Sequence, residues 1–156
     1  MRLAVLAIVG LAVPSAAGAD NLVPYWTSIV PGKARVRTGP GRNFPATWLY
    51  QRAGLPVRVI ETFPNWRRIQ DPDGATGWMQ ANLLTDKRRM GMVRGAIVEL
   101  RAAPETGARV TYRAQGGVIG ELTRCTSDWC ILDVRGKRGW LLKRALWGVD
   151  GTESWN

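Results

Sequence analysis

The chain has 156 residues, no histidine, two cysteines and a formal net charge of +10 at pH 7. The lack of histidine excludes the usual general base at neutral pH, the Ser-His and Cys-His nucleophile pairs, and histidine-containing metal sites. Two cysteines alone make a poor zinc site. We therefore predict a protein that is not an enzyme and has no metal site and no cofactor.

The N-terminal segment, residues 1–19, has the pattern of a secretory signal peptide. A basic start at Arg2 precedes an apolar run over residues 3–13, and Ala17-Gly18-Ala19 is a small-residue cleavage motif. The alternative is a membrane anchor, but the apolar run is well short of the roughly 20 residues needed to cross a bilayer. We predict cleavage after Ala19 and a periplasmic or secreted mature chain without an integral membrane segment.

The positive charge bears on the partner. In a cytoplasmic protein this charge balance would suggest nucleic acid. An exported chain instead meets cell-wall carboxylates, acidic lipids and acidic proteins, so we expect no nucleic acid. The alternative, that the charge only keeps a small exported protein soluble, stays open.

The mature chain consists of short strand-like segments separated by turns. Residues 25–30 and 35–38 have strand character, whereas the Gly- and Pro-rich residues 39–45 predict a long loop. Pro64-Asn65 predicts a tight turn between two further strands. No window shows a sustained helical period, and only residues 80–84 could form a single turn. We predict an all-β chain with strands at about ten-residue spacing.

The second half of the chain repeats the order of the first. Three landmarks return at a nearly constant offset: Val36-Arg37-x-x-Pro40 as Leu100-Arg101-x-x-Pro104, Trp66-x-x-Ile69 as Trp129-x-x-Leu132, and Gly77-Trp78 as Gly139-Trp140. A constant offset with little identity between landmarks indicates two copies of one small fold.

The repeat predicts the domain boundaries. We expect a first barrel over residues 20–90, a second barrel over residues 91–149, and a loose acidic tail over residues 150–156. Met90 and Val93 have the character of a final strand that closes the first barrel, so the connection between the barrels should be short and stiff.

The two cysteines belong to the second copy. Cys125 and Cys130 take the place of residues 62–67 in the first copy, where a Pro-Asn turn joins two strands. Cysteines that flank such a turn lie opposite each other, at Cα separations of about 4.5 to 5.5 Å that suit a disulfide. Because an exported chain meets oxidising conditions, we predict that the two form a disulfide.

Several motifs resemble a known family. Val36-Arg37-x-Gly39-Pro40-Gly41 and Asn65-Trp66-Arg67-Arg68-Ile69 look like bacterial SH3-like domains. Residues 117–122 and the closing Leu146-Trp147-Gly148-Val149 resemble exported tandem SH3-like proteins of alphaproteobacteria. The resemblance covers about residues 23–150 and implies two tandem SH3-like small β-barrels. It also implies a module that binds cell-wall peptides or envelope proteins.

Aromatic and arginine side chains are the candidate binding residues. If Ile69 points into the barrel, strand periodicity places Trp66 on the outer face. By the same reasoning, an inward-pointing Leu132 places Trp129 on the outer face. Exposed Trp and Arg are typical interface anchors. We therefore predict a contact surface, mainly on the first barrel, from these residues: Trp66, Arg37, Arg67, Trp48, Tyr50 and Trp129. The alternative, that Trp66 and Trp129 lie against the long loop as part of the core, stays open.

Asp71 and Asp73 flank a proline, a spacing that we interpret as turn formation and not as a catalytic acid–base pair. The sequence thus predicts a non-catalytic periplasmic binding module that contacts peptidoglycan or a cell-envelope protein. The alternative function is a structural or accessory subunit of a larger envelope assembly.

Overall fold

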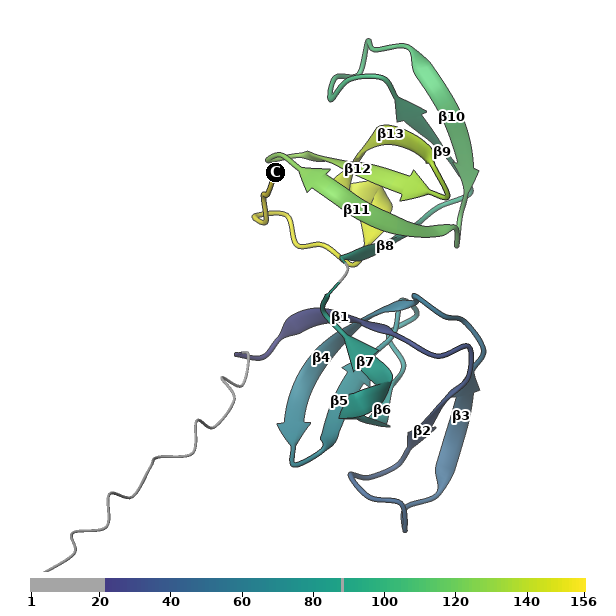
Figure 1. Ribbon diagram of the computed structural model, residues 1–156, viewed down its shortest axis with the longest axis vertical. Coiled ribbons are helices and arrows are strands. Elements are labelled where there is room, and N and C mark those ends of the chain that lie inside the picture. Colours follow the sequence, from purple (N-terminus) through teal and green to yellow (C-terminus); the bar gives the residue numbers. More distant parts are fainter. Residues whose placement is uncertain (1–21, 88) are drawn as a thin grey trace, which may run out of the picture.

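The computed structural model describes residues 22–87 and 89–156 (Figure 1). These residues form β-strands and two short 3-10 turns, which confirms the prediction of an all-β protein. The predicted signal peptide, residues 1–19, lies outside the described residues. Within the described ranges, no helix is long and apolar enough to cross a membrane.

The first barrel is one bent antiparallel sheet with the strand order β3-β2-β6-β5-β4-β1-β7. Its core consists of alternate, inward-facing residues such as Val36, Val59 and Ile69, as expected for strands with one buried face. The predicted helical turn forms as η1 (Ala81–Leu83). The strands are β1 (Tyr25–Ile29), β2 (Ala34–Arg37), β3 (Ala46–Tyr50), β4 (Pro56–Phe63), β5 (Trp66–Gln70), β6 (Thr76–Gln80) and β7 (Leu84–Thr85).

The second barrel repeats this topology strand for strand, with the order β10-β9-β13-β12-β11-β8-β14. A second 3-10 turn, η2 (Lys143–Ala145), takes the place of η1. The predicted tandem of two small β-barrels is therefore confirmed. The strands are β8 (Met90–Val93), β9 (Ile97–Arg101), β10 (Val110–Gln115), β11 (Ile119–Cys125), β12 (Trp129–Val134), β13 (Lys137–Leu142) and β14 (Leu146–Trp147).

The strand at the junction differs from the expectation. Met90–Val93 does not close the first barrel but opens the second, where β8 pairs with β11 and β14. The first sheet closes instead with β7, which pairs with β1. A short apolar strand has the same pattern in either role, and the hydrogen-bond partners decide between them.

The disulfide forms as predicted. Cys125 ends β11 and Cys130 lies on β12, and the two residues are directly paired across the strands. Their Cα atoms are 4.1 Å apart and their sulfur atoms are bonded. The bridge closes the turn between β11 and β12, and both cysteines are buried in the core of the second barrel.

The tail is docked, so the expectation of a loose tail is wrong. Trp155 exchanges two backbone hydrogen bonds of 2.9 Å with Cys125 and packs against the second core. The ammonium group of Lys143, a residue only 6% exposed, donates to the backbone oxygens of Gly151 and Glu153. A buried ammonium needs acceptors, and the tail carbonyls supply them.

The two barrels stack end to end and share an interface (Figure 1). The indole rings of Trp26 and Trp147 meet edge to face with centroids 4.8 Å apart. The indole N–H of Trp147 donates to the backbone oxygen of Pro56 at 2.9 Å. Across the same interface, Arg58 lies 3.7 Å from the carboxylate of Asp150. These contacts hold one barrel against the other.

Candidate functional site

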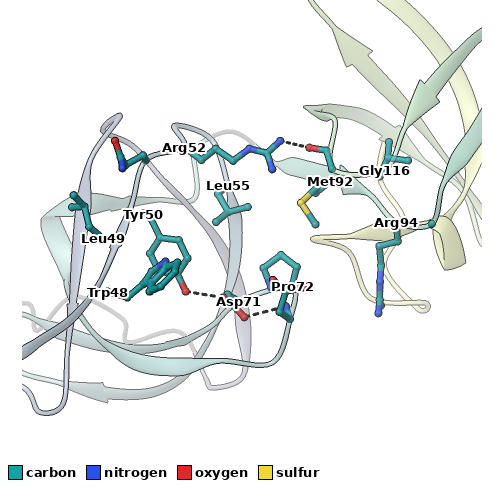
Figure 2. Close-up of a pocket in the computed structure, with 15 residues that line it drawn as sticks. Trp48, Leu49, Tyr50, Arg52, Leu55, Asp71, Pro72, Met92, Arg94 and Gly116 are labelled. Atoms are coloured by element: carbon teal, nitrogen blue, oxygen red, sulfur yellow. Dashed lines mark hydrogen bonds between the residues drawn. The ribbon is translucent and has the colours of Figure 1, made fainter.

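A groove of about 670 Å³ lies between the two barrels (Figure 2). The first barrel contributes β3, the residues that follow it and the β5–β6 turn; the second contributes the end of β8 and the β10–β11 turn. We call this hollow the inter-barrel groove. Its lining residues are Trp48, Leu49, Tyr50, Gln51, Arg52, Leu55, Asp71, Pro72, Asp73, Met92, Val93, Arg94, Gly95, Gly116 and Gly117.

Two predicted binding residues, Trp48 and Tyr50, line this groove together. They lie opposite Val36 and Ala34 of β2, so both side chains belong to the inner face of the sheet. Strand β3 is the edge of that sheet, and a β-bulge interrupts its pairing with β2. Bulges bend strands away from regular pairing. The Trp48 side chain is therefore 64% exposed, although its partner Val36 is buried.

Tyr50 is held in place by Asp71. Its hydroxyl donates to the Asp71 carboxylate at 2.8 Å, as Figure 2 shows. Burial, the hydrogen bond to Asp71 and the negative charge of that carboxylate together raise the pKa of Tyr50 well above its usual range. The phenol is thus a fixed neutral donor that presents its ring to the groove.

Asp71 serves the turn, as predicted. Its carboxylate accepts the backbone N–H groups of Asp73 at 3.0 Å and Ala75 at 2.8 Å. Gly74 closes the turn with a positive φ of 88°, a conformation that glycine adopts without strain. This turn places Pro72 and the exposed Asp73 at the groove wall. Asp71 therefore couples the turn to the aromatic wall.

The second barrel supplies the opposite wall. Arg52 of the first barrel donates to the backbone oxygen of Gly117 in the second barrel, and this hydrogen bond spans the groove at one end (Figure 2). A Cβ atom at Gly116 would collide with the backbone oxygen of Gly95, so this wall depends on a glycine. The guanidinium group of Arg94 lies 5.8 Å from the ring centre of Trp147, at the barrel interface.

The structure corrects the prediction for Trp66. This residue is only 8% exposed, so it is not an outward-facing anchor. Strand periodicity gives the face of a sheet but not the cover over it. On central strand β5, Trp66 lies directly between Phe63 of β4 and Gln80 of β6. Side chains opposite each other in a sheet lie close together, and on this central strand the indole is buried.

The remaining predicted residues lie away from the inter-barrel groove. Arg37 donates to the backbone oxygen of Phe44 at 2.7 Å and so braces the long loop. Arg67 donates to the hydroxyl of Tyr25 at 3.1 Å. Trp129 is half-buried and lies on another face of the second barrel. The structure thus brings Trp48 and Tyr50 together but not the other four.

The second barrel lacks the same arrangement. By strand register, Tyr112 takes the place of Trp48, and Ala114 that of Tyr50. Val134 takes the place of Asp71. Each lies two residues after a matching core residue, Leu132 in the second barrel and Ile69 in the first. The tyrosine–aspartate pair therefore belongs to the first barrel alone. Sequence reasoning missed Asp71 as its partner, since the pairing appears only once the strands are folded.

The groove presents aromatic and charged groups that can contact a ligand. Apart from the tyrosine–aspartate pair, these are the exposed indole of Trp48, the carboxylate of Asp73 and the guanidinium groups of Arg52 and Arg94. In the described ranges no three His, Cys, Asp or Glu side chains gather as a metal site would require.

The bacterial SH3 domain family matches the chain twice, over residues 30–86 and 94–148. The chain belongs to this family. Bacterial SH3 domains are cell-wall binding modules and are typically extracellular or periplasmic. The first match spans β2 to β7 and the second β9 to β14, so each lies within one barrel and the fold and the family agree.

A comparison with solved structures finds similarity to NlpC1 and NlpC2 from Trichomonas vaginalis and to an NlpC/P60 family protein from Bacillus cereus. Their identities to this chain are 11%, 12% and 13%, and their TM-scores are 0.35, 0.37 and 0.33. The alignments cover 88%, 85% and 78% of this chain, but only 50%, 52% and 55% of the other chains. This chain thus spans about half their length. No curated protein shows a significant sequence match.

Proposed function

We propose that the protein is a non-catalytic binding module of the periplasm and that it holds a peptidoglycan peptide in the inter-barrel groove. The observation that carries the proposal is the exposed indole of Trp48 beside the fixed ring of Tyr50. Large aromatic side chains that stay exposed next to a rigid wall are typical binding anchors. Membership of a family of cell-wall binding modules supports the same ligand class.

The polar groups of the groove suit a peptide with charges of both signs. Asp73 supplies an exposed carboxylate on the first barrel, and Arg94 an exposed guanidinium on the second. Peptidoglycan stem peptides carry both carboxylates and amines, so one group could meet each wall. Because the two walls come from different barrels, both barrels would be needed for full affinity.

The test compares retention on purified peptidoglycan sacculi for two matched variants, Trp48→Ala and Tyr112→Ala. Tyr112 takes the equivalent place in the second barrel and is 41% exposed, so it controls for loss of an exposed aromatic. Trp48→Ala should weaken retention by about 2 kcal/mol, the size typical of a lost anchor. Tyr112→Ala should leave it unchanged.

Trp48→Ala should leave the melting temperature close to that of the wild type, since Trp48 is largely in water. Tyr112 is 41% exposed, so Tyr112→Ala should lower the melting temperature only modestly and leave the protein folded during the assay. Equal retention of all three proteins would rule out the groove as the binding site. If the wild type fails to bind sacculi and instead co-purifies with an envelope protein, the alternative of an accessory subunit replaces the proposal.

A further inference from the structure

A second groove lies on the second barrel, around Trp129. Two hollows of about 550 Å³ each adjoin there and share the lining residues Trp129, Leu142, Arg144 and Thr106. They lie between β9, the start of β12, the end of β13 and the η2 turn. We call this surface the Trp129 groove. Apart from Arg94, which directly follows β8, it shares no lining residue with the inter-barrel groove.

Trp129 is a pre-organised anchor in this groove. It lies directly opposite Leu142 across β12 and β13, and its ring is only partly buried. The residue after it, Cys130, is tied by the disulfide to Cys125. The backbone oxygen of Trp129 accepts the N–H of Thr126 at 2.8 Å. Because the turn is cross-linked, little conformational entropy remains to be lost when a ligand contacts the indole.

The groove carries more positive than negative charge. Its carboxylates are Glu99 on β9 and the exposed Asp128, against five basic lining residues, Arg94, Arg101, Arg113, Lys143 and Arg144. Glu99 pairs with Arg101 at 2.6 Å and with Arg113 at 3.4 Å. One carboxylate thus serves two guanidinium groups. Arg144 is exposed, and its guanidinium group forms no hydrogen bond or ion pair with any described residue. The positive charge that remains points into solvent at the groove.

The first barrel shows that the fold does not require these charges. In η1, Asn82 takes the place of Arg144, and on β3, Leu49 takes the place of Arg113. The equivalent of Trp129 there is the covered Trp66. The same barrel therefore folds without a basic rim and without an accessible indole at this position. A feature that the fold does not need is a candidate for recognition.

We propose that the Trp129 groove binds an acidic, extended segment of a partner protein. Carboxylates of the segment would pair with Arg144 and Arg113, and an apolar side chain would contact Trp129 and Leu142. A peptide is favoured because β9 pairs with β13 only through Arg101 and Trp140 among the described residues. The remaining backbone on that side of β9 can hydrogen-bond to an added strand. This inference does not depend on the proposed peptidoglycan contact.

The probe for the test is a fluorescein-labelled peptide of glutamates around one central leucine, with the glutamine version as its control. The full mature chain is titrated in fluorescence anisotropy at a salt concentration near 0.15 M, where distant exposed charges are screened. Arg144→Glu should weaken binding by about tenfold or more, as expected on losing one interface anchor. The matched charge reversal Arg35→Glu, on an exposed β2 residue of the other barrel that lines neither groove, should change it by less than about twofold.

A second readout locates the peptide. In an NMR titration the indole N–H signal of Trp129, assigned with Trp129→Phe, should shift, and that of Trp48 should not. Equal weakening by Arg144→Glu and Arg35→Glu would overturn the proposal, because the attraction would then be diffuse. Equal binding of the glutamine peptide would also overturn it. So would retention on phosphatidylglycerol vesicles that depends on Arg144, combined with no response to the peptide, since the partner would then be a lipid surface.

Discussion

Trp147 joins the two barrels, and its replacement tests whether they behave as one unit. Its indole N–H donates to the backbone oxygen of Pro56, which belongs to the other barrel and is fully buried. Its ring meets Trp26 edge to face, with the two planes at 85°. Trp147→Phe keeps an aromatic ring in place but removes the donor. Trp147→Ala removes both.

The magnitudes follow from these contacts. Loss of the donor leaves the buried Pro56 carbonyl without a partner, at a cost of about 1 to 3 kcal/mol. The aromatic pair contributes about 0.5 to 1.5 kcal/mol beyond its buried area. We therefore expect Trp147→Phe to lower the free energy of unfolding by about 2 kcal/mol. Trp147→Ala should lower it by about 3 to 5 kcal/mol, the range for large-to-small substitutions.

Urea unfolding provides the assay. Each barrel is small and buries little apolar area alone, so the coupled wild type should unfold in one transition. Trp147→Ala should separate the transition into two, with smaller slopes for each. The matched control is Trp48→Phe, which alters an exposed indole and should cost less than about 0.5 kcal/mol. If Trp147→Phe and Trp48→Phe have the same stability, the interface does not couple the barrels and the reasoning fails.

Two further predictions concern the groove and the tail. Because the pKa of Tyr50 is raised in the folded protein, the unfolded chain loses its phenolic proton first. The stability that Tyr50 contributes is therefore fully present below its ordinary pKa near 10 and declines above it. In urea titrations from pH 9 to 11, the difference in the free energy of unfolding between the wild type and Tyr50→Phe should shrink. A difference that stays constant over this range would contradict the prediction. Lys143→Met removes the ammonium group that donates to the tail carbonyls. Hydrogen exchange of the Trp155 amide should therefore speed up by about tenfold or more. An unchanged exchange rate would show that the backbone pairing with Cys125 holds the tail without Lys143.

The sequence alone determined the architecture because local signals and a repeat carry it. The recurring landmarks around Arg37 and Arg101 indicate two copies of one fold, and the turn-rich spacing indicates short strands. The five-residue separation of Cys125 and Cys130 placed both on one hairpin, which the structure confirms. Each of these inferences depends on neighbours in the chain.

Only the tertiary structure decided which of these residues are accessible and which meet. Trp66 lies on a central strand with a neighbour on each side and is buried, although strand periodicity places it on the outer face. The barrel to which Met90–Val93 belongs is decided by its hydrogen-bond partners. Tyr50 meets Asp71, and Arg52 meets Gly117, across long stretches of chain. Strand periodicity assigns a side chain to a face, but exposure depends on how the sheet bends and on what packs over it. Contacts between distant segments leave no periodic signal in one sequence, so both grooves became visible only in the folded chain.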